Sequence, residues 1–312
     1  MIAVLAGGTG GAKLARGMLD VVGAAELTVI ANTADDVEIY GVHVSPDPDL
    51  ITYWLADRID SRGFGIAGDT WHLMDALEDA GHPTWFRLGD RDLAMCLIRT
   101  EHLRAGARLT DAHGHVVRAM RVDARVLPMS DEPVRTEVRA EGRSRPFQEF
   151  MIVDRAAARI EGLELRGIDQ ARPTPEVLEA IAGAEAIVIG PSNPVISIGP
   201  ILAVPGMRDA LRAAAAPVVA VSPFVGGRTV KGPTEPFMAF AGLERGAAGI
   251  VAAYEGLLDG LVCDERLADP GLPVCVADTL MDDPASGRSV AETTLSFAAG
   301  LARGRPETEA RH

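Results

Sequence analysis

The sequence predicts an α/β protein with a doubly wound, mainly parallel sheet. Short apolar runs of strand length recur along the chain and are separated by stretches with helical spacing of apolar residues. The runs lie at 2–6, 27–31, 184–190, 216–222 and 258–264. Several of them end in turns rich in Gly, Ser or Pro, as parallel strands do when a helix follows. A chain of 312 residues, 47% of them apolar, can bury the core of one large or two modest domains.

The two ends of the chain supply the elements of this sheet. Residues 2–31 give a strand, a glycine cluster, an amphipathic helix to about Val22 and a second strand. Later helical stretches alternate with the remaining strands, and the last is expected to stop at Gly304. These stretches lie at 175–183, 206–215, 247–257 and 289–304. We therefore assign 1–40 and 173–312 to one core.

The middle of the chain, 41–172, has a different pattern. Helices are predicted near 48–58, 69–80 and 90–105, each opened by Asp or Pro at Asp47–Pro48, Asp69 and Asp90. Two runs with alternating apolar residues, 134–140 and 147–153, predict strands. We interpret this segment as a mixed α+β insert that covers the carboxyl edge of the sheet.

Composition excludes several classes of function. The net charge of −14 argues against nucleic-acid binding, and no apolar run approaches the about 20 residues of a membrane span. The first residues lack a basic segment and a cleavage site for a signal peptide, so we expect a cytoplasmic protein. Three cysteines without a Cys-x-x-Cys pair favour neither a disulfide framework nor a zinc site.

The glycine cluster between the first strand and helix is a candidate phosphate-binding turn. Backbone N–H groups of Gly8, Thr9, Gly10 and Gly11 can approach a phosphate closely at a helix N-terminus. The cluster differs from a Walker loop, because Ala12 precedes Lys13 and Leu14 follows it. It also differs from a dinucleotide fingerprint, since Lys13 stands at the third Gly position and the second strand ends in Asn32 instead of an acid. A tight turn without a ligand is the alternative.

Lysine is confined to two positions in this chain. Lys13 and Lys231 are the only lysines, and both lie in glycine-rich segments. Such a cation beside a glycine turn suits an anionic ligand.

Paired acids follow the second strand and the next turn. Asp35 and Asp36 lie at the carboxyl edge, where ligands of open α/β sheets bind, and Asp47 and Asp49 come shortly after. One or two carboxylates can hold Mg²⁺ while substrate phosphates complete its shell. A helix cap at Asp47 is equally compatible with the second pair.

Two further loops carry polar side chains. Gly190–Pro194 follows a buried strand, and its Ser192 and Asn193 offer neutral donors and acceptors for a nucleobase or ribose. The segment Leu88–Asp92 opens a helix, either as a simple cap or as a loop that contacts a polar substrate. Among the seven histidines, only His113 and His115 have a spacing that could suit a metal, and we interpret this pair as part of a solvated turn. No nucleophile motif for acyl chemistry is present.

Together these residues resemble the 2-phospho-L-lactate transferase family of coenzyme F420 biosynthesis. The resemblance is carried, in chain order, by GGTGGAKL, NTADD, SPDPD, LGDRD, LPMSD, GPSNPVISIGP, VSP and ADTLM. It implies a Rossmann-like nucleotide-binding core. It also implies a guanosine-diphosphate-linked donor of phospholactate or phosphoenolpyruvate, the deazaflavin FO as acceptor, release of GMP, a requirement for Mg²⁺ and a homodimer.

The resemblance also implies roles for individual residues. Gly8, Thr9, Gly10, Gly11 and Lys13 would bind the diphosphate, and Ser192 and Asn193 the guanosine. Asp35 and Asp49 would hold the metal. Asp36 would accept the hydroxyl proton, and Lys13 would stabilise charge. The FO side would take Asn32, Asp47, Gly89, Asp90 and Arg91.

Two other functions stay open from the sequence. A related group of proteins with this fold binds UDP-sugars and regulates carbon and cell-wall metabolism; LGDRD followed by LPMSD argues against that reading. A nucleotide-binding protein without catalysis has less need of two acid pairs at one edge. The sequence does not distinguish phospholactate, phosphoenolpyruvate and phosphoglycerate as the transferred group.

Overall fold

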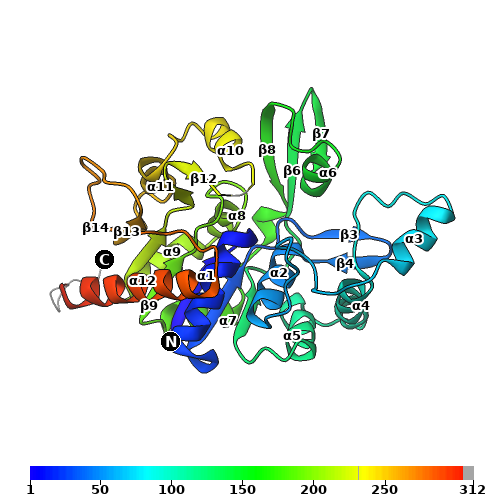
Figure 1. Cartoon of the computed structure of the whole chain (residues 1–312), viewed down its shortest axis with the longest axis horizontal. Coiled ribbons are helices and arrows are strands. Elements are labelled where there is room, and N and C mark those ends of the chain that lie inside the picture. The colour runs from blue at the N-terminus through cyan, green and yellow to red at the C-terminus, as the bar shows by residue number, and fades with distance from the viewer. Residues whose placement is uncertain (231, 305–312) are drawn as a thin grey trace.

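A computed structural model describes residues 1–230 and 232–304 of the chain. Its centre is a parallel sheet of seven strands in the order β14-β13-β10-β9-β1-β2-β5 (Figure 1). The strands are β1 (Ile2–Ala6), β2 (Leu27–Ala31), β5 (Arg125–Pro128), β9 (Ala186–Ile189), β10 (Val218–Val221), β13 (Gly260–Cys263) and β14 (Val274–Val276). The predicted α/β class and doubly wound parallel sheet are confirmed.

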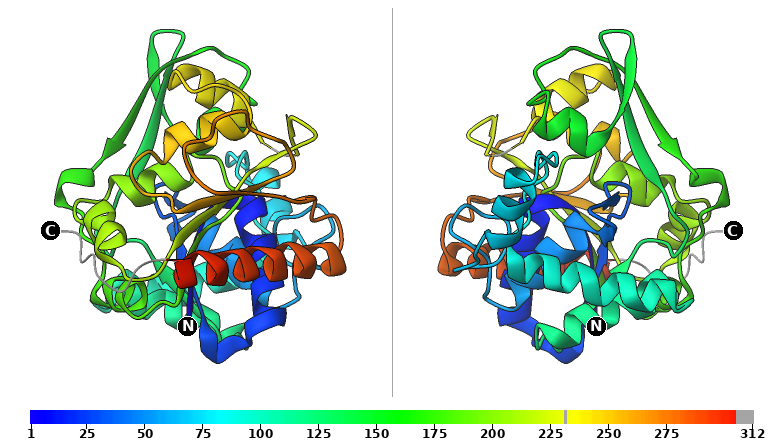
Figure 2. Two further views of the ribbon diagram at one scale, coloured as in Figure 1. Left: turned by 90° about the vertical axis from the view of Figure 1, so that its left-hand side faces the viewer. Right: turned by 90° about the vertical axis from the view of Figure 1, so that its right-hand side faces the viewer.

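Helices cover both faces of this sheet, which explains why its inner strands are continuous apolar runs. One face carries α1 (Gly8–Val22), α2 (Pro46–Leu55), α5 (Leu109–Ala119) and α12 (Pro284–Gly304). The other carries α7 (Pro175–Ala182), α8 (Ile198–Ala203), α9 (Met207–Ala213) and α11 (Ala247–Ala253). Helix α12 crosses α1 closely, since a Cβ at Gly17 would overlap the carbonyl oxygen of Gly287 (Figure 2).

The middle of the chain builds two peripheral parts. One contains the hairpin of β3 (Val37–Ile39) and β4 (Val42–Val44) with α3 (His72–Asp79) and α4 (Asp90–Arg104). The other is an antiparallel sheet in the order β7-β6-β8, which stands beside α10 in Figure 1. Its elements are β6 (Arg135–Ala140), β7 (Arg143–Pro146), α6 (Phe147–Ile152), β8 (Ile160–Arg166) and α10 (Thr234–Phe240). Short elements complete the chain: η1 (Ala24–Glu26), η2 (Ile168–Gln170), β11 (Phe224–Val225) and β12 (Arg228–Thr229).

Two details of the predicted organisation differ from the structure. Residues 147–152 form the helix α6, not a strand, because Phe147 and Phe150 bury one helical face while the residues between them are half-buried. Strand β5 lies inside the range 41–172 but pairs with β2 as the edge of the central sheet. The middle segment is therefore not wholly separate from the core.

The described helices include none that is long and apolar enough to cross a lipid bilayer.

Candidate functional site

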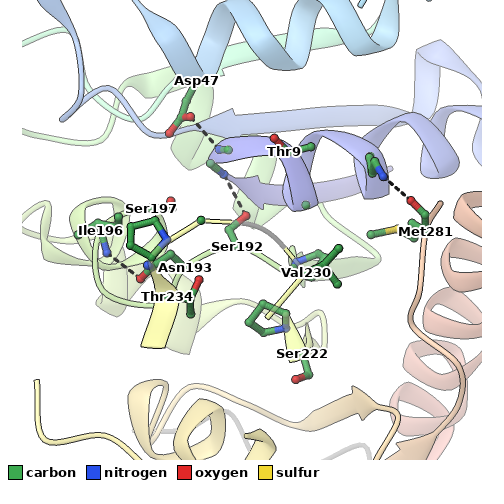
Figure 3. Close-up of a pocket in the computed structure, with 18 of the residues that line it drawn as sticks. Thr9, Asp47, Ser192, Asn193, Ile196, Ser197, Ser222, Val230, Thr234 and Met281 are labelled. Carbon is green, nitrogen blue, oxygen red and sulfur yellow. Dashed lines mark hydrogen bonds between the residues drawn. The ribbon is translucent and has the colours of Figure 1, made fainter. Parts of the chain in front are cut away.

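A cavity of about 370 Å³ opens at the carboxyl ends of the central strands (Figure 3). It is bounded by the start of α1, the acidic loops (the segments that carry Asp35 and Asp47), the loop after β9, the loop after β10, α6, and the segment before α12. Residues used below that line it are Gly8, Thr9, Gly10, Lys13, Asp35, Asp47, Phe147, Gln148, Met151, Ser192, Asn193, Thr279 and Met281. This is the edge at which ligands of open α/β sheets gather.

The glycine turn presents the N-terminus of α1 to this cavity. The first N–H groups of a helix have no carbonyl partner within the helix. The Gly8 N–H donates to Asp47 Oδ1 at 2.7 Å, and the Gly7 N–H donates to Ser192 Oγ at 3.3 Å. Thr9 lines the cavity wall in Figure 3, and Gly10 lines it as well. Because the N–H groups of Gly7 and Gly8 are engaged, those of Thr9 and Gly10 are the ones that this helix end can offer to an anion.

Close packing explains why glycine occupies this turn. A Cβ at Gly10 would overlap the carbonyl oxygen of Pro191. A Cβ at Gly11 would lie 2.6 Å from Ser192 Oγ and 2.8 Å from the Cβ of Ala6. The turn therefore rests directly on the loop after β9, and the structure brings Gly8–Gly11 together with Ser192 as the sequence predicts.

Lys13 lies further along α1 and reaches the same cavity. Its Nζ donates to the carbonyl oxygen of Met281 at 2.5 Å and lies 5.8 Å from the ring centroid of Trp54. The ammonium group is thus held against the segment that precedes α12, at Met281, which Figure 3 labels. Lys231, the other lysine, lies outside the described residues.

Two of the four predicted acids, Asp35 and Asp47, line the cavity. Asp35 is buried, and its Oδ1 has no hydrogen-bond partner within the described part of the chain. Burial, followed by the charges of Asp47 and Asp36, raises the pKa of Asp35 well above its usual range. Burial also raises the pKa of Asp47 to about 6, against the hydrogen bonds from Asn32 and Gly8. A group that keeps these carboxylates ionised here must bring positive charge.

Asn32 positions this pair from behind. Its Nδ2 donates to Asp47 Oδ2 at 3.0 Å, and its Oδ1 accepts from the Ala34 N–H at 2.9 Å. The Asn32 side chain is buried and does not line the cavity, although the family resemblance implied that it would contact FO.

The other two acids, Asp36 and Asp49, lie behind the cavity. Asp36 accepts from Ser45 Oγ at 2.7 Å and lies 2.9 Å from His43 Nε2. Both oxygens of Asp49 accept from Arg99, at 2.6 and 2.8 Å. Helix α2 begins at Pro46, so Asp47 and Asp49 point about 200° apart around its axis. The structure thus places Asp47, and not Asp49, beside the cavity with Asp35.

The LGDRD segment has a clear capping role. Asp90 accepts from Thr70 Oγ1 and from the N–H groups of His72 and Leu73 at the start of α3. Asp69 in turn accepts from the N–H groups of Arg91 and Asp92 at the start of α4. Gly89 is the residue that precedes α4, and Gly89, Asp90 and Arg91 are not among the residues of the cavity wall.

The loop after β9 has one side chain with an unused donor. Asn193 Oδ1 accepts from the N–H groups of Val195 and Ile196 at 2.9 and 3.3 Å, which closes the loop before α8. Its Nδ2 is buried and has no partner among the described residues. Asn193 and Ser192 both line the cavity, as predicted from the sequence.

Several cavity residues were missed in the sequence. Phe147, Gln148 and Met151 come from α6, which the alternating pattern of apolar residues had predicted to be a strand. Gln148 Nε2 donates to the backbone oxygen of Asp35 at 3.2 Å, so α6 is tied to the acidic loop. Thr279, whose buried Oγ1 has no partner among residues 1–230 and 232–304, belongs to the ADTLM motif, which was noted but not assigned a role.

A buried histidine next to Asp49 predicts a loss of stability in acid. Burial lowers the pKa of His113 from 6.5 to about 4. Its stabilising effect is therefore complete above the unfolded pKa and is lost as the pH falls toward the folded value. We expect wild type to lose about 2 kcal/mol through this group between pH 7.5 and 5.0. His113→Gln should lose less over that interval in urea unfolding; an equal loss would contradict this assignment.

Comparison with known proteins places the chain in a family. Residues 2–272 match the family model described as 2-phospho-L-lactate transferase CofD. The chain is 40% identical to a phosphoenolpyruvate transferase of Kitasatospora aureofaciens, covering 97% of this chain and 99% of that one. It is 39% identical to a 2-phospho-L-lactate transferase of Methanosarcina mazei, covering 94% of this chain and 98% of the relative.

A solved structure shares the fold. A member of the UPF0052 family from Bacillus halodurans matches with a TM-score of 0.63, at 18% identity over 94% of this chain and 98% of that one. Likeness at this identity concerns the fold alone. The extended match to the family model and to both relatives carries the assignment: this chain belongs to the 2-phospho-L-lactate transferase family.

Proposed function

We propose that this chain transfers a 2-phospholactyl or phosphoenolpyruvyl group from a guanosine-diphosphate-linked donor to the ribityl hydroxyl of FO and releases GMP. The names of the two relatives support the transferred group. The observation that carries the proposal is a buried Asp35 oxygen, without a partner among the described residues, in the same cavity as the N-terminus of α1. A site of this kind needs a cation and accepts a phosphate.

We expect the donor to lie in the cavity in one orientation. Its diphosphate would lie against Thr9, Gly10 and the start of α1, where N–H groups and the helix dipole favour anions. Its guanosine would then extend along the loop after β9. There the unused Nδ2 of Asn193 can donate to a base or ribose oxygen.

The donor set at the acidic loop fits Mg²⁺. Asp35 and Asp47 offer carboxylate oxygens at the cavity, and burial raises the pKa of each, so a bound cation would favour their ionised forms. Mg²⁺ is held in many phosphate sites by one or two carboxylates together with substrate phosphates. When bound, it would neutralise diphosphate charge and polarise the transferred phosphoryl group. Asp49 is a weaker candidate, because Arg99 takes both of its oxygens.

The chain's own residues would align the reactants. An FO hydroxyl oxygen forms a bond to the distal phosphorus while the bridging bond to GMP breaks, so no protein nucleophile is needed. N–H groups of the turn and Lys13 would stabilise the charge that develops on the phosphates. The hydroxyl proton would pass to Asp35, which lines the cavity and has one oxygen without a partner among the described residues, whereas both oxygens of Asp36 and of Asp47 are engaged.

The acceptor side of the cavity would come from the middle segment. Phe147 and Met151 of α6 offer apolar surface to a flat ring, and Gln148 adds a polar contact. Gly89, Asp90 and Arg91 would contribute only by shaping the neighbouring helices. The family resemblance also implies a homodimer, which sedimentation of the purified chain would test.

A direct assay tests this function. The protein is mixed with FO, Mg²⁺ and guanylyl donors that carry phospholactate, phosphoenolpyruvate or phosphoglycerate, and GMP is measured. We expect GMP release that depends on both FO and Mg²⁺, with one donor preferred. Absence of release with all three donors would refute the proposal, and binding of a UDP-sugar instead would favour a regulatory role.

A further inference from the structure

We propose that Arg99 is a positioning residue: its guanidinium group clamps both ends of the segment 43–49 and so sets Asp47 against the start of α1. Arg99 lies in α4, outside the cavity wall, and its side chain is fully buried. The inference rests on the role of Asp47 in the proposed function.

The two ends of the segment are held by one side chain. At the first end, Nε and Nη2 of Arg99 donate to the carbonyl oxygen of His43 in β4, at 3.3 and 3.0 Å. At the other end, Nη1 and Nη2 donate to the two oxygens of Asp49 in the first turn of α2. The planar fork of arginine permits both contacts at once, which a lysine ammonium does not.

The residues between these ends face the cavity and the acidic loop. Ser45 Oγ donates to Asp36, next to Asp35 in the chain. Asp47 accepts from the Gly8 N–H and from Asn32 Nδ2. A shift of the segment would therefore move Asp47 away from the N-terminus of α1. The clamp thus links helix α4 of the middle segment, through Asp47, to the glycine turn of the core.

The buried ion pair is better explained by geometry than by stability. Removing two charges from water offsets most of their attraction, so such pairs add little net stability compared with apolar residues. Its contribution here is a fixed distance between β4 and α2. In this way Arg99 influences the position of Asp47 in the cavity without contacting a substrate.

Arg99→Lys tests the clamp while keeping the positive charge. We expect Mn²⁺ to bind the variant about tenfold more weakly than wild type in the presence of GDP, measured by electron paramagnetic resonance. We also expect faster amide hydrogen exchange in peptides covering 43–49. Arg104→Lys is the matched control, since Arg104 lies on the same helix, is exposed and donates to Gly41, outside the clamp. That variant should retain wild-type metal binding.

The outcomes separate this inference from the proposed function. If Asp49 binds the metal directly, Arg99→Lys would free one of its oxygens and leave Mn²⁺ binding equal or tighter, which overturns the clamp. Unchanged exchange over 43–49 overturns it as well. If wild type fails to bind Mn²⁺ with GDP, the proposed metal site is refuted, and the exchange measurement alone then decides on the clamp.

A double variant covers the case in which Arg99→Lys does not fold. Arg99→Met with Asp49→Leu leaves no unpaired buried charge, so its melting temperature should stay close to that of wild type. Amide exchange over 43–49 should still be faster, because the His43 carbonyl also loses its donors. Protection equal to wild type in the folded double variant would contradict the clamp.

Discussion

Asp35→Asn is expected to lower kcat/KM at least about a hundredfold, because it removes a cavity carboxylate that no other described residue replaces. The fold should be at least as stable as wild type at neutral pH. Burial and the charges of neighbouring acids make the Asp35 carboxylate costly to ionise, whereas an amide carries no charge. Steady-state kinetics and urea unfolding of the same preparations measure the two effects.

The free energy of unfolding of wild type and of Asp35→Asn should depend differently on pH. The pKa of Asp35 is raised in the folded state, so its stabilising effect is fully present below the unfolded value of 3.8. That effect is lost as the pH rises toward the folded value. The Asn variant should lack this decline, and at pH 8 Mg²⁺ should raise the melting temperature of wild type only. Asp123→Asn, at an exposed site, is the control; equal turnover of the two variants would refute the role of Asp35.

Gly10→Ala is expected to weaken GDP binding about a hundredfold and to destabilise the fold by about 1–3 kcal/mol. The added Cβ would overlap the carbonyl oxygen of Pro191, and a backbone atom has no rotamer by which to yield. The glycine turn at the start of α1 and the loop after β9 would have to move apart. Calorimetric titration with GDP and urea unfolding measure the two losses.

A second glycine on a helix provides the control for this change. Gly300 lies in α12, is exposed, and a Cβ there would meet no atom within 4 Å. Gly300→Ala should bind GDP like wild type and gain about 0.5–1 kcal/mol of stability. If Gly10→Ala behaves like Gly300→Ala, the close packing of the turn is not what shapes the donor site.

The parts of the fold that depend on local pattern were predictable from the sequence. Buried strands such as β1 and β9 are continuous apolar runs, and the glycine turn between β1 and α1 is a local signal. The segment 147–152 was ambiguous, since Phe147 and Phe150 fit a helix face while the neighbouring residues also fit alternation. Strand β5, with the sequence RVLP, begins with Arg125 and ends with Pro128, so it gave no comparable apolar run.

The choice between Asp47 and Asp49 required the tertiary structure. Asp47 and Asp49 both belong to the motif SPDPD, and their spacing in the sequence does not distinguish which of them could bind a metal. Their different positions are set by the start of α2 at Pro46 and by the contact of Asp49 with Arg99, which lies fifty positions later in the chain. Asp90 accepts a hydrogen bond from Leu73, seventeen positions earlier at the start of α3, so the capping alternative for LGDRD could be stated from sequence but not decided.

Diffraction from crystals grown with Mn²⁺ and GDP would test the central claim most directly. We expect an anomalous peak at coordinating distance from Asp35 and Asp47, with the diphosphate against Gly8–Gly11. A peak among Asp49, Asp92 and Cys96, the group whose ligand atoms lie within 4.8 Å of one another behind the cavity, would contradict the account. A diphosphate bound away from the start of α1 would contradict it equally.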